Sequence, residues 1–269
     1  MTRRLVALSI AGSDPSGGAG IQADLKTFSA LGVYGTSVIT ALTAQNTVGV
    51  TGVHVVPTDF VTQQLETLVA DVRLDAIKIG MLANAGVIGA VGDFLGRHPH
   101  DHVVLDPVMV ATSGDQLLDD DAIAAMRDLM PLASLITPNL AEAAALLDTR
   151  AARSLADMRL HAIALQELGA ARVLIKGGHL NDGSEAVDLL LDVDGEAILR
   201  APRVDTENTH GTGCTLSSAL AALRPQRDSW LEAAFDAKSW LTAALVAADV
   251  LEIGHGHGPV NHFHEFWTP

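Results

Sequence analysis

Short apolar runs that alternate with helix-like segments constrain the fold of this chain more than any other feature of its sequence. Runs such as 76–79 and 103–105 are aliphatic and short, as buried strands are. Between them lie segments with apolar residues at helical spacing, for example 21–31. This alternation predicts an α/β fold with a mostly parallel central sheet and helices on both faces.

The boundaries of these segments follow from apolar periodicity and from glycine, proline and capping residues. Thr58 or Asp59 is expected to cap the helix that follows it, and Asp194-Gly195 is a hairpin signal. No linker, repeat or low-complexity run divides residues 1–269, so we expect a single domain. Strands are predicted at 5–11, 33–42, 50–56, 76–79, 103–105, 135–137, 173–175, 187–191 and 197–199, and helices at 21–31, 60–72, 86–95, 121–130, 141–147, 154–168, 216–223 and 231–251.

Polar and glycine residues gather where predicted strands end. Gly12, Asp106, Asn139 and Lys176 each stand at the end of a strand-like run or directly after it. Ligands of open α/β sheets bind outside the carboxyl ends of the strands. The sequence therefore predicts a binding site at this edge of the sheet.

The segment NTHGTGCT, residues 208–215, joins a strand-like run to the helix at 216–223. Its two glycines let the backbone turn and approach a ligand closely, and the N–H groups at a helix start favour an anion. Cys214, the only cysteine, lies in the first helical turn, where the pKa of a thiol is lowered. A plain turn followed by a cysteine packed in the core is the alternative interpretation.

Two carboxylates and a lysine complete the candidate site. Asp106 and Glu142 offer oxygen ligands that suit magnesium, and Lys176 beside two glycines can reach a phosphate. Alone, Glu142 could be a helix-start acid, Asp106 a turn former and Lys176 a surface lysine. Two common phosphate motifs are absent, because Gly18 replaces the lysine of a Walker loop and Leu216 the third glycine of a dinucleotide fingerprint.

Composition excludes several classes of function. The net charge is −15, from 17 Lys+Arg and 32 Asp+Glu, which argues against binding to nucleic acid or an anionic membrane. The apolar stretch 231–253 contains charged residues, Asp236, Lys238 and Asp249 among them, and is too polar to cross a membrane. A single cysteine excludes an internal disulfide and fits a reducing cytoplasm. The first apolar run is explained better by a strand than by a signal peptide.

Histidines are frequent in the last part of the chain. His255, His257, His262 and His264 invite a metal interpretation. Their spacing is irregular, and no matching cysteine or acidic cluster surrounds them. We therefore expect a structural role, or a role as a lid over the substrate.

Several motifs, taken together and in their order along the chain, resemble those of the ribokinase-like superfamily. Within it, they resemble the hydroxymethylpyrimidine/phosphomethylpyrimidine kinases of thiamine biosynthesis. Each motif alone is weak, but the set runs from about Leu5 to Phe266. The matching segments are AGSDPSGGAGIQADLK (11–26), VITALTAQN (38–46), KIGML (78–82), VLDPVM (104–109), ITPNLAEA (136–143), KGGH (176–179), NTHGTGCT (208–215) and GHGPV (256–260).

The resemblance implies transfer of phosphate from ATP with Mg²⁺, first to 4-amino-5-hydroxymethyl-2-methylpyrimidine and then to its monophosphate. It also implies a cytoplasmic homodimer. The aminopyrimidine would contact Gly12, Asp24, Gln45, Met81 and Val108; Asp106 and Glu142 would hold the metal; Lys176, Asn139 and Thr209 would bind the nucleotide; and Gly211 and Gly213 would form the anion hole.

Cys214 distinguishes this resemblance from the wider superfamily, in which sugar kinases carry an aspartate as the base. A cysteine at this position is found in hydroxymethylpyrimidine kinases and in some related pyridoxal kinases. We therefore predict that Cys214 accepts the proton of the substrate hydroxyl. Asn261 departs from the family, where this position is often His.

Three other functions compete with this interpretation. A pyridoxal kinase would use the same scaffold, because pyridoxal is also a flat heteroaromatic ring with a hydroxymethyl group. A non-catalytic pyrimidine-binding protein would not need Asp106, Lys176 and Cys214. A cysteine hydrolase would need His210 as its base, and the sequence shows no second element to orient it. Segment 112–120 and the glycine-rich tail are candidate lids.

Overall fold

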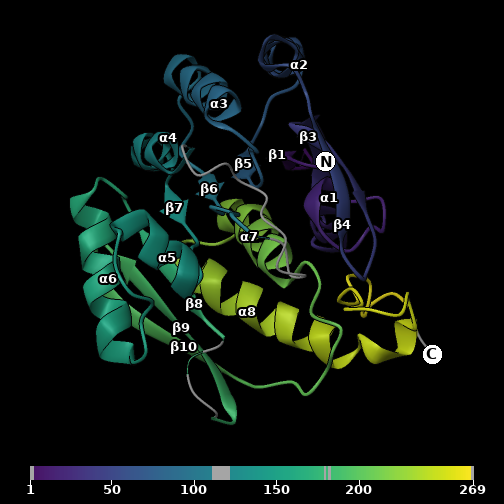
Figure 1. Cartoon of the computed structure of the whole chain (residues 1–269), viewed down its shortest axis with the longest axis vertical. Helices are drawn as coiled ribbons and strands as arrows, with labels where there is room; N and C mark the ends of the chain where they lie inside the picture. Colours follow the sequence, from purple (N-terminus) through teal and green to yellow (C-terminus); the bar gives the residue numbers. More distant parts are fainter. Residues whose placement is uncertain (1–2, 111–121, 179, 181–182, 268–269) are drawn as a thin grey trace.

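The computed structural model describes residues 3–110, 122–178, 180 and 183–267. The strands are β1 (Val6–Ala11), β2 (Tyr34–Ile39), β3 (Ala41–Gln45), β4 (Val50–Val55), β5 (Ala76–Ile79), β6 (Val103–Leu105), β7 (Leu135–Ile136), β8 (Val173–Gly177), β9 (Glu185–Asp192) and β10 (Gly195–Pro202). Eight of them form one sheet in the order β10-β9-β8-β7-β6-β5-β1-β2 (Figure 1). The remaining two, β3 and β4, pair with each other in a small second sheet.

The large sheet is mostly parallel. Neighbouring strands from β2 across to β8 run parallel, whereas β9 is antiparallel to both β8 and β10. The turn between β9 and β10 contains Gly195 at a φ of 128°, a conformation that favours glycine. The α/β class, the mostly parallel sheet and the hairpin at Asp194-Gly195 are thus confirmed.

Helices cover both faces of this sheet and bury a separate apolar core on each side. They are α1 (Gly20–Ala30), α2 (Thr58–Val69), α3 (Ala85–Arg97), α4 (Ala122–Leu129), α5 (Leu140–Leu147), α6 (Leu155–Glu167), α7 (Thr212–Leu223) and α8 (Trp230–Val246), with short 3-10 turns at Met130–Leu132, Arg224–Gln226 and Asp249–Leu251. Helices α2 to α6 pack on one face with Leu8, Ile77 and Leu105, and α1, α7 and α8 pack on the other with Ala7, Ala76 and Val104. This division follows from the alternation of side chains along each strand.

Some predicted boundaries were wrong. Segment 33–42 is not one strand: the chain bends at Thr40, which is fully buried and donates its hydroxyl to Met81 O at 2.7 Å, and β3 then leaves the large sheet. Helix α2 begins at Thr58, so neither Thr58 nor Asp59 caps it. Pro57 precedes it with the fixed φ of proline, −51°, and ends the extended segment there. Helix α8 ends at Val246, earlier than expected, and the chain then folds back.

The end of the chain packs against α7 and α8. The N–H of Asn261 donates to Ala244 O at 3.1 Å, and His262 Nε2 lies 3.0 Å from the hydroxyl of Thr215. His262 is only 4% exposed, so a structural role is supported for this histidine. Across the described residues, no group of three or more potential metal-ligating side chains occurs, and no helix is both long and apolar enough to span a membrane. The predicted lid segment 112–120 lies outside the described residues.

We predict that His262 makes the stability of the fold depend on pH. Burial lowers the pKa of His262 to about 3, with a contribution from Lys26. The unfolded chain therefore takes up this proton near pH 6.5, while the folded chain does not until about pH 3. As the pH is lowered from 6.5 to about 3, the free energy of unfolding should therefore fall by up to about 1.4 kcal/mol per pH unit.

Urea unfolding at several pH values tests this expectation. His262→Gln can still hydrogen-bond Thr215 but cannot take up a proton, so its stability should fall less steeply with acid. His54→Gln, at an exposed position on β4, should behave as the parent does. An equal slope for parent and His262→Gln would contradict the prediction.

Candidate active site

A cavity of about 720 Å³ lies at the carboxyl edge of the sheet and reaches the start of α7. It is bordered by residues that end or follow β1, β5, β6, β7 and β8, where the sequence predicted a binding site. All predicted site residues except Asp24 line it, namely Gly12, Gln45, Met81, Val108, Asp106, Glu142, Asn139, Lys176, Thr209, Gly211, Gly213 and Cys214. The fold thus brings together residues that are far apart in the sequence.

The start of α7 forms a backbone cradle. Gly211 precedes the helix with φ 75° and ψ 10°, and no side chain caps the N-terminus. A Cβ on Gly211 would collide with the carbonyl oxygen of Gly18, so only glycine fits there. A Cβ on Gly213 would lie 3.3 Å from Lys176 Nζ, which places this lysine at the cradle. The helix start and the lysine together favour an anion, such as a phosphate.

Cys214 is partly exposed in the first turn of α7 and lines the cavity. Burial raises the pKa of its thiol above the ordinary value, and the nearby cation of Lys78 opposes this without reversing it. The expectation that the helix start gives a depressed thiol pKa was therefore wrong for the ligand-free chain. Loss of water around the sulfur outweighs the charge of Lys78 and the hydrogen bond from the Gly20 backbone.

Asp106, Lys176 and Glu142 form a charged cluster at the ends of β6 and β8 and the start of α5. Lys176 Nζ lies 2.6 Å from Asp106 Oδ1 and 3.6 Å from Glu142 Oε2. Burial acts to raise the pKa of Asp106, but Lys176 and Lys78 outweigh it and hold that pKa below its usual range. Burial raises the pKa of Glu142 to about 7, and Lys176 only partly opposes this.

Asn139 and Glu142 also cap helix α5. Asn139 Oδ1 accepts the N–H groups of Ala141 and Glu142, both at 2.9 Å, and Glu142 Oε2 accepts the N–H of Asn139 at 2.7 Å. This reciprocal capping box fixes Glu142 against the cavity. The simple interpretation of Glu142 as a helix-start acid is correct, and it does not conflict with a ligand role, because a carboxylate has several acceptor positions.

The donor set of this cluster fits a magnesium ion. Asp106 and Glu142 are buried oxygen donors that share Lys176, and magnesium typically takes one or two carboxylates together with water and phosphate oxygens. Ser217 and Thr137 donate hydroxyl groups to Asp106 at 3.1 and 3.3 Å and fix its orientation.

Asp24 does not line the cavity, so the prediction that it contacts the substrate was wrong for this structure. Its carboxylate is fully buried, 2.9 Å from Lys78 Nζ, and accepts the hydroxyl groups of Ser9 and Ser218 at 2.5 and 2.6 Å. These contacts use its acceptor positions inside the protein. Asp24 instead fixes Lys78, a cavity residue that no sequence motif singled out as functional.

Gln45, Met81 and Val108 line a second region of the cavity, beside Gly12. A Cβ on Gly12 would lie 3.0 Å from Met81 Sδ, so a larger residue there would crowd the wall. Gln45 supplies the polar group of this region. An amide beside apolar walls suits a flat heteroaromatic ligand with donor and acceptor atoms on its edge.

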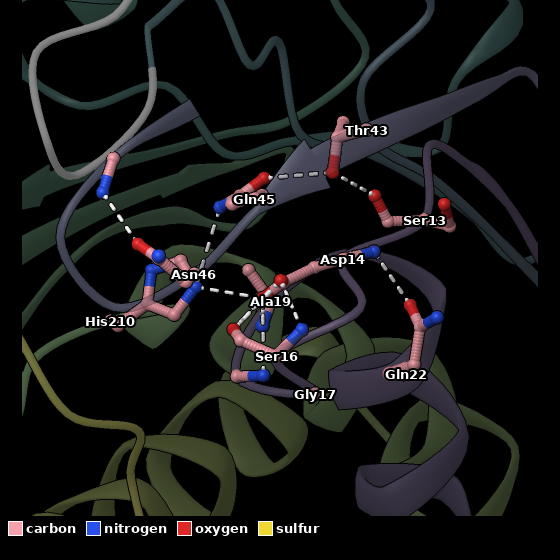
Figure 2. Close-up of polar contacts among 12 residues, drawn as sticks. Ser13, Asp14, Ser16, Gly17, Ala19, Gln22, Thr43, Gln45, Asn46 and His210 are labelled. Carbon is pink, nitrogen blue, oxygen red and sulfur yellow. Dashed lines mark hydrogen bonds and ion pairs between the residues drawn. The ribbon is translucent and has the colours of Figure 1, made fainter. Parts of the chain in front are cut away.

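The sequence did not reveal that His210 and Asp14 form a hydrogen-bonded pair. Figure 2 shows His210 Nε2 directed at Asp14 Oδ2, at a distance of 2.8 Å. Asp14 is thus the orienting element that the sequence did not reveal. This ring nitrogen faces Asp14 and Gln45, and no hydrogen bond joins His210 to Cys214 among the described residues, so the arrangement does not favour a cysteine hydrolase.

The chain is similar to known proteins over nearly its whole length. A family model described as phosphomethylpyrimidine kinase matches residues 14–261. A hydroxymethylpyrimidine/phosphomethylpyrimidine kinase from Salmonella typhimurium is 58% identical, covering 98% of this chain and 100% of the relative. One from Rhizobium meliloti is 54% identical, covering 97% and 98%.

Solved structures show the same fold. A pyridoxal kinase from Bacillus subtilis in complex with ADP matches with a TM-score of 0.90 and 36% identity, covering 99% of this chain and 100% of that one. A phosphomethylpyrimidine kinase from Clostridium difficile matches with a TM-score of 0.80 and 40% identity, covering 90% and 100%.

The Asp24–Lys78 pair gives a prediction that separates a structural role from substrate contact. Asp24→Asn leaves Lys78 buried without its counter-charge and should lower the free energy of unfolding by about 3–5 kcal/mol. Replacing both residues, Asp24→Asn with Lys78→Met, should recover part of this loss. Urea unfolding measures both, with the exposed Asp59→Asn as control. Unchanged stability with a raised KM for the substrate would contradict our assignment and restore the substrate contact.

Proposed function

This chain belongs to the phosphomethylpyrimidine kinase family, and on that premise we propose that it phosphorylates 4-amino-5-hydroxymethyl-2-methylpyrimidine with ATP. The monophosphate then accepts a second phosphoryl group to give the diphosphate used in thiamine biosynthesis, in keeping with the names of the relatives. The observation that carries the proposal is the position of Cys214, which lines one cavity together with the backbone cradle and the Gln45 region.

Cys214 is the proposed base. The hydroxymethyl oxygen gives its proton to the thiolate and attacks the γ-phosphorus of ATP, while the bond from that phosphorus to the bridging oxygen breaks and ADP leaves. The raised pKa of Cys214 makes its thiolate a strong proton acceptor, although a scarce one at neutral pH. Lys78 favours the thiolate by its charge.

The cradle and Lys176 are proposed to stabilise the transferred phosphoryl group. The N–H groups at the start of α7 and the ammonium of Lys176 lie where negative charge would develop. Thr209 and Asn139 line the same cavity and are proposed to contact the nucleotide. A magnesium ion held by Asp106 and Glu142 would neutralise phosphate charge.

The pyrimidine is proposed to lie between Met81 and Val108 with its edge on Gln45. The chain is proposed to act as one kinase domain, in the cytoplasm and as a homodimer. Exposed apolar side chains on β2 to β4, among them Tyr34, Leu42 and Val53, offer a surface that a dimer could bury.

A pyridoxal kinase is the second candidate function. It is favoured by the similarity in fold to pyridoxal kinases, with TM-scores of 0.88 to 0.90 and 33–36% identity. The higher identity to hydroxymethylpyrimidine/phosphomethylpyrimidine kinases, up to 58%, ranks it below the first.

The decisive assay couples ADP release to each alcohol in turn. We expect turnover with the aminopyrimidine and a fall in kcat of about 100-fold or more in Cys214→Ala, because general-base catalysis is lost. Cys214→Ser, whose hydroxyl has a similar size but stays protonated near neutral pH, should recover little. Turnover with pyridoxal alone would move the assignment to the second candidate, and full activity of Cys214→Ala would exclude the cysteine as base.

Glu142→Gln tests the metal site. Glutamine can still accept the N–H of Asn139 and keep the cap of α5, but it lacks the charge that holds a cation. The Mg²⁺ concentration for half-maximal rate should rise about tenfold, as expected for the loss of about 1.4 kcal/mol of binding. Initial rates at saturating ATP and pyrimidine measure this, with Glu66→Gln, which lies outside the cavity lining, as control. An unchanged Mg²⁺ dependence would remove Glu142 from the metal site.

A further inference from the structure

The amide of Gln45 lies between two polar neighbours that nothing so far assigns to substrate recognition. Its Nε2 is 3.4 Å from His210 Nε2, and its Oε1 is 3.2 Å from Thr43 Oγ1 (Figure 2). All three residues line the cavity. What each neighbour can donate or accept decides how the amide is held.

His210 Nε2 cannot accept a hydrogen bond from Gln45. Its Nε2 lies 2.8 Å from Asp14 Oδ2, and an ionised carboxylate accepts hydrogen bonds but cannot donate them. Asp14 is ionised, since its pKa is held at about 2: burial acts to raise it, and hydrogen bonds from His210 and Ser16 outweigh the burial. Nε2 must therefore carry the hydrogen and cannot accept one from the amide nitrogen.

Thr43 acts toward Gln45 as an acceptor only. Its hydroxyl has one hydrogen, and the carbonyl oxygen of Ser13 lies 2.8 Å from Thr43 Oγ1. That carbonyl can only accept, so it takes the hydrogen. The lone pairs of Thr43 Oγ1 are left to receive an N–H group from Gln45.

We propose that His210 and Thr43 fix the orientation of the Gln45 amide, with Oε1 toward His210 and Nε2 toward Thr43. The two ends of a primary amide have the same shape, so donor and acceptor accounting decides between them. With the ends exchanged, Thr43 Oγ1 receives an N–H group, and Gln45 Oε1 shares with Asp14 the single N–H of His210 Nε2. The opposite orientation sets N–H against N–H and requires two hydrogens from one hydroxyl. His210, Asp14 and Thr43 are thereby positioning residues.

The surroundings of His210 hold it firmly in place. Its backbone N–H donates to Gly258 O at 3.0 Å, and its ring packs so closely on Gly18 that a Cβ there would collide with it. Asp14 is itself fixed by the N–H groups of Ser16 and Ala19, at 2.9 and 2.8 Å. The Nε2–H group of His210, which faces Gln45, therefore cannot easily turn away.

A fixed amide presents one donor and one acceptor to the cavity in a set order. This step rests on the proposed aminopyrimidine substrate, whose ring nitrogen accepts and whose adjacent amine donates. The amine would face the Oε1 end, near His210, and the ring nitrogen the Nε2 end, near Thr43. The 4-oxo analogue, which carries N–H in the ring and a carbonyl in place of the amine, presents the reverse order and should be rejected.

The test compares kcat/KM for the aminopyrimidine with kcat/KM for its 4-oxo analogue. The parent should prefer the amine by about 100-fold or more, since the wrong order leaves buried polar groups unpaired. In Thr43→Val the amide can turn, and the preference should fall about tenfold. Thr43→Ser keeps the hydroxyl and should retain the preference. Thr51→Val, at an exposed position on β4, is the matched control.

A general loss of structure would lower both rates and leave their ratio unchanged, so the ratio reports on orientation alone. Where turnover is too low to measure, the ratio of dissociation constants from calorimetry serves in its place. His210→Phe, which fills the space without an N–H, should also reduce the preference. Equal ratios in parent, Thr43→Val and Thr43→Ser would overturn the proposal while the kinase function stands. No turnover of the aminopyrimidine by the parent would overturn both.

Discussion

The ion pair between Asp24 and Lys78 is the interaction on which the site depends. Both side chains are fully buried, so each needs the other to offset its loss of water. Asp24 on α1 also binds Ser9 of β1 and Ser218 of α7, while Lys78 belongs to β5. Such a pair does not stabilise a fold more than apolar packing would. Any other packing of these elements would leave a buried charge without its partner and is therefore unfavourable. Cys214 lies one turn before Ser218 and is positioned by the same contact.

An acidic chain can accept an anion here because the cavity is electrostatically distinct from the surface. Its lysines are each paired with an aspartate: Lys78 with Asp24, Lys176 with Asp106, and Lys238 with Asp188 at 2.6 Å. These pairs are close to neutral, so the net charge of −15 does not dominate at this edge. The uncapped start of α7 would then supply the attraction for phosphate, which is a backbone property and does not depend on composition.

Local patterns in the sequence were sufficient for most elements and for the polar residues at strand ends, because apolar periodicity and turn residues act over a few positions. Asp24 was misjudged, although it shares a helical face with Ile21 and Phe28, which are buried. Its spacing therefore pointed inward. Its partner Ser218 is 194 residues away, and Asp14 is 196 residues from His210, so neither contact leaves a local signal. The burial that raises the pKa of Cys214 likewise exists only in the packed chain.

Two glycine contacts join the loop after β1 to the backbone cradle at the start of α7. The ring of His210 packs against the backbone of Gly18, and Gly211 packs against the carbonyl group of Gly18. A side chain at either glycine would force the two segments apart. The loop that follows β1 is therefore packed directly against the start of α7. One wall of the pocket that would hold the alcohol is thus fixed relative to the cradle that would hold the phosphoryl group. Rate enhancement by proximity requires this kind of fixed alignment. In this protein the alignment arises from close backbone packing at Gly18 and Gly211. The charged residues of the cavity are added to a backbone arrangement that this packing already fixes.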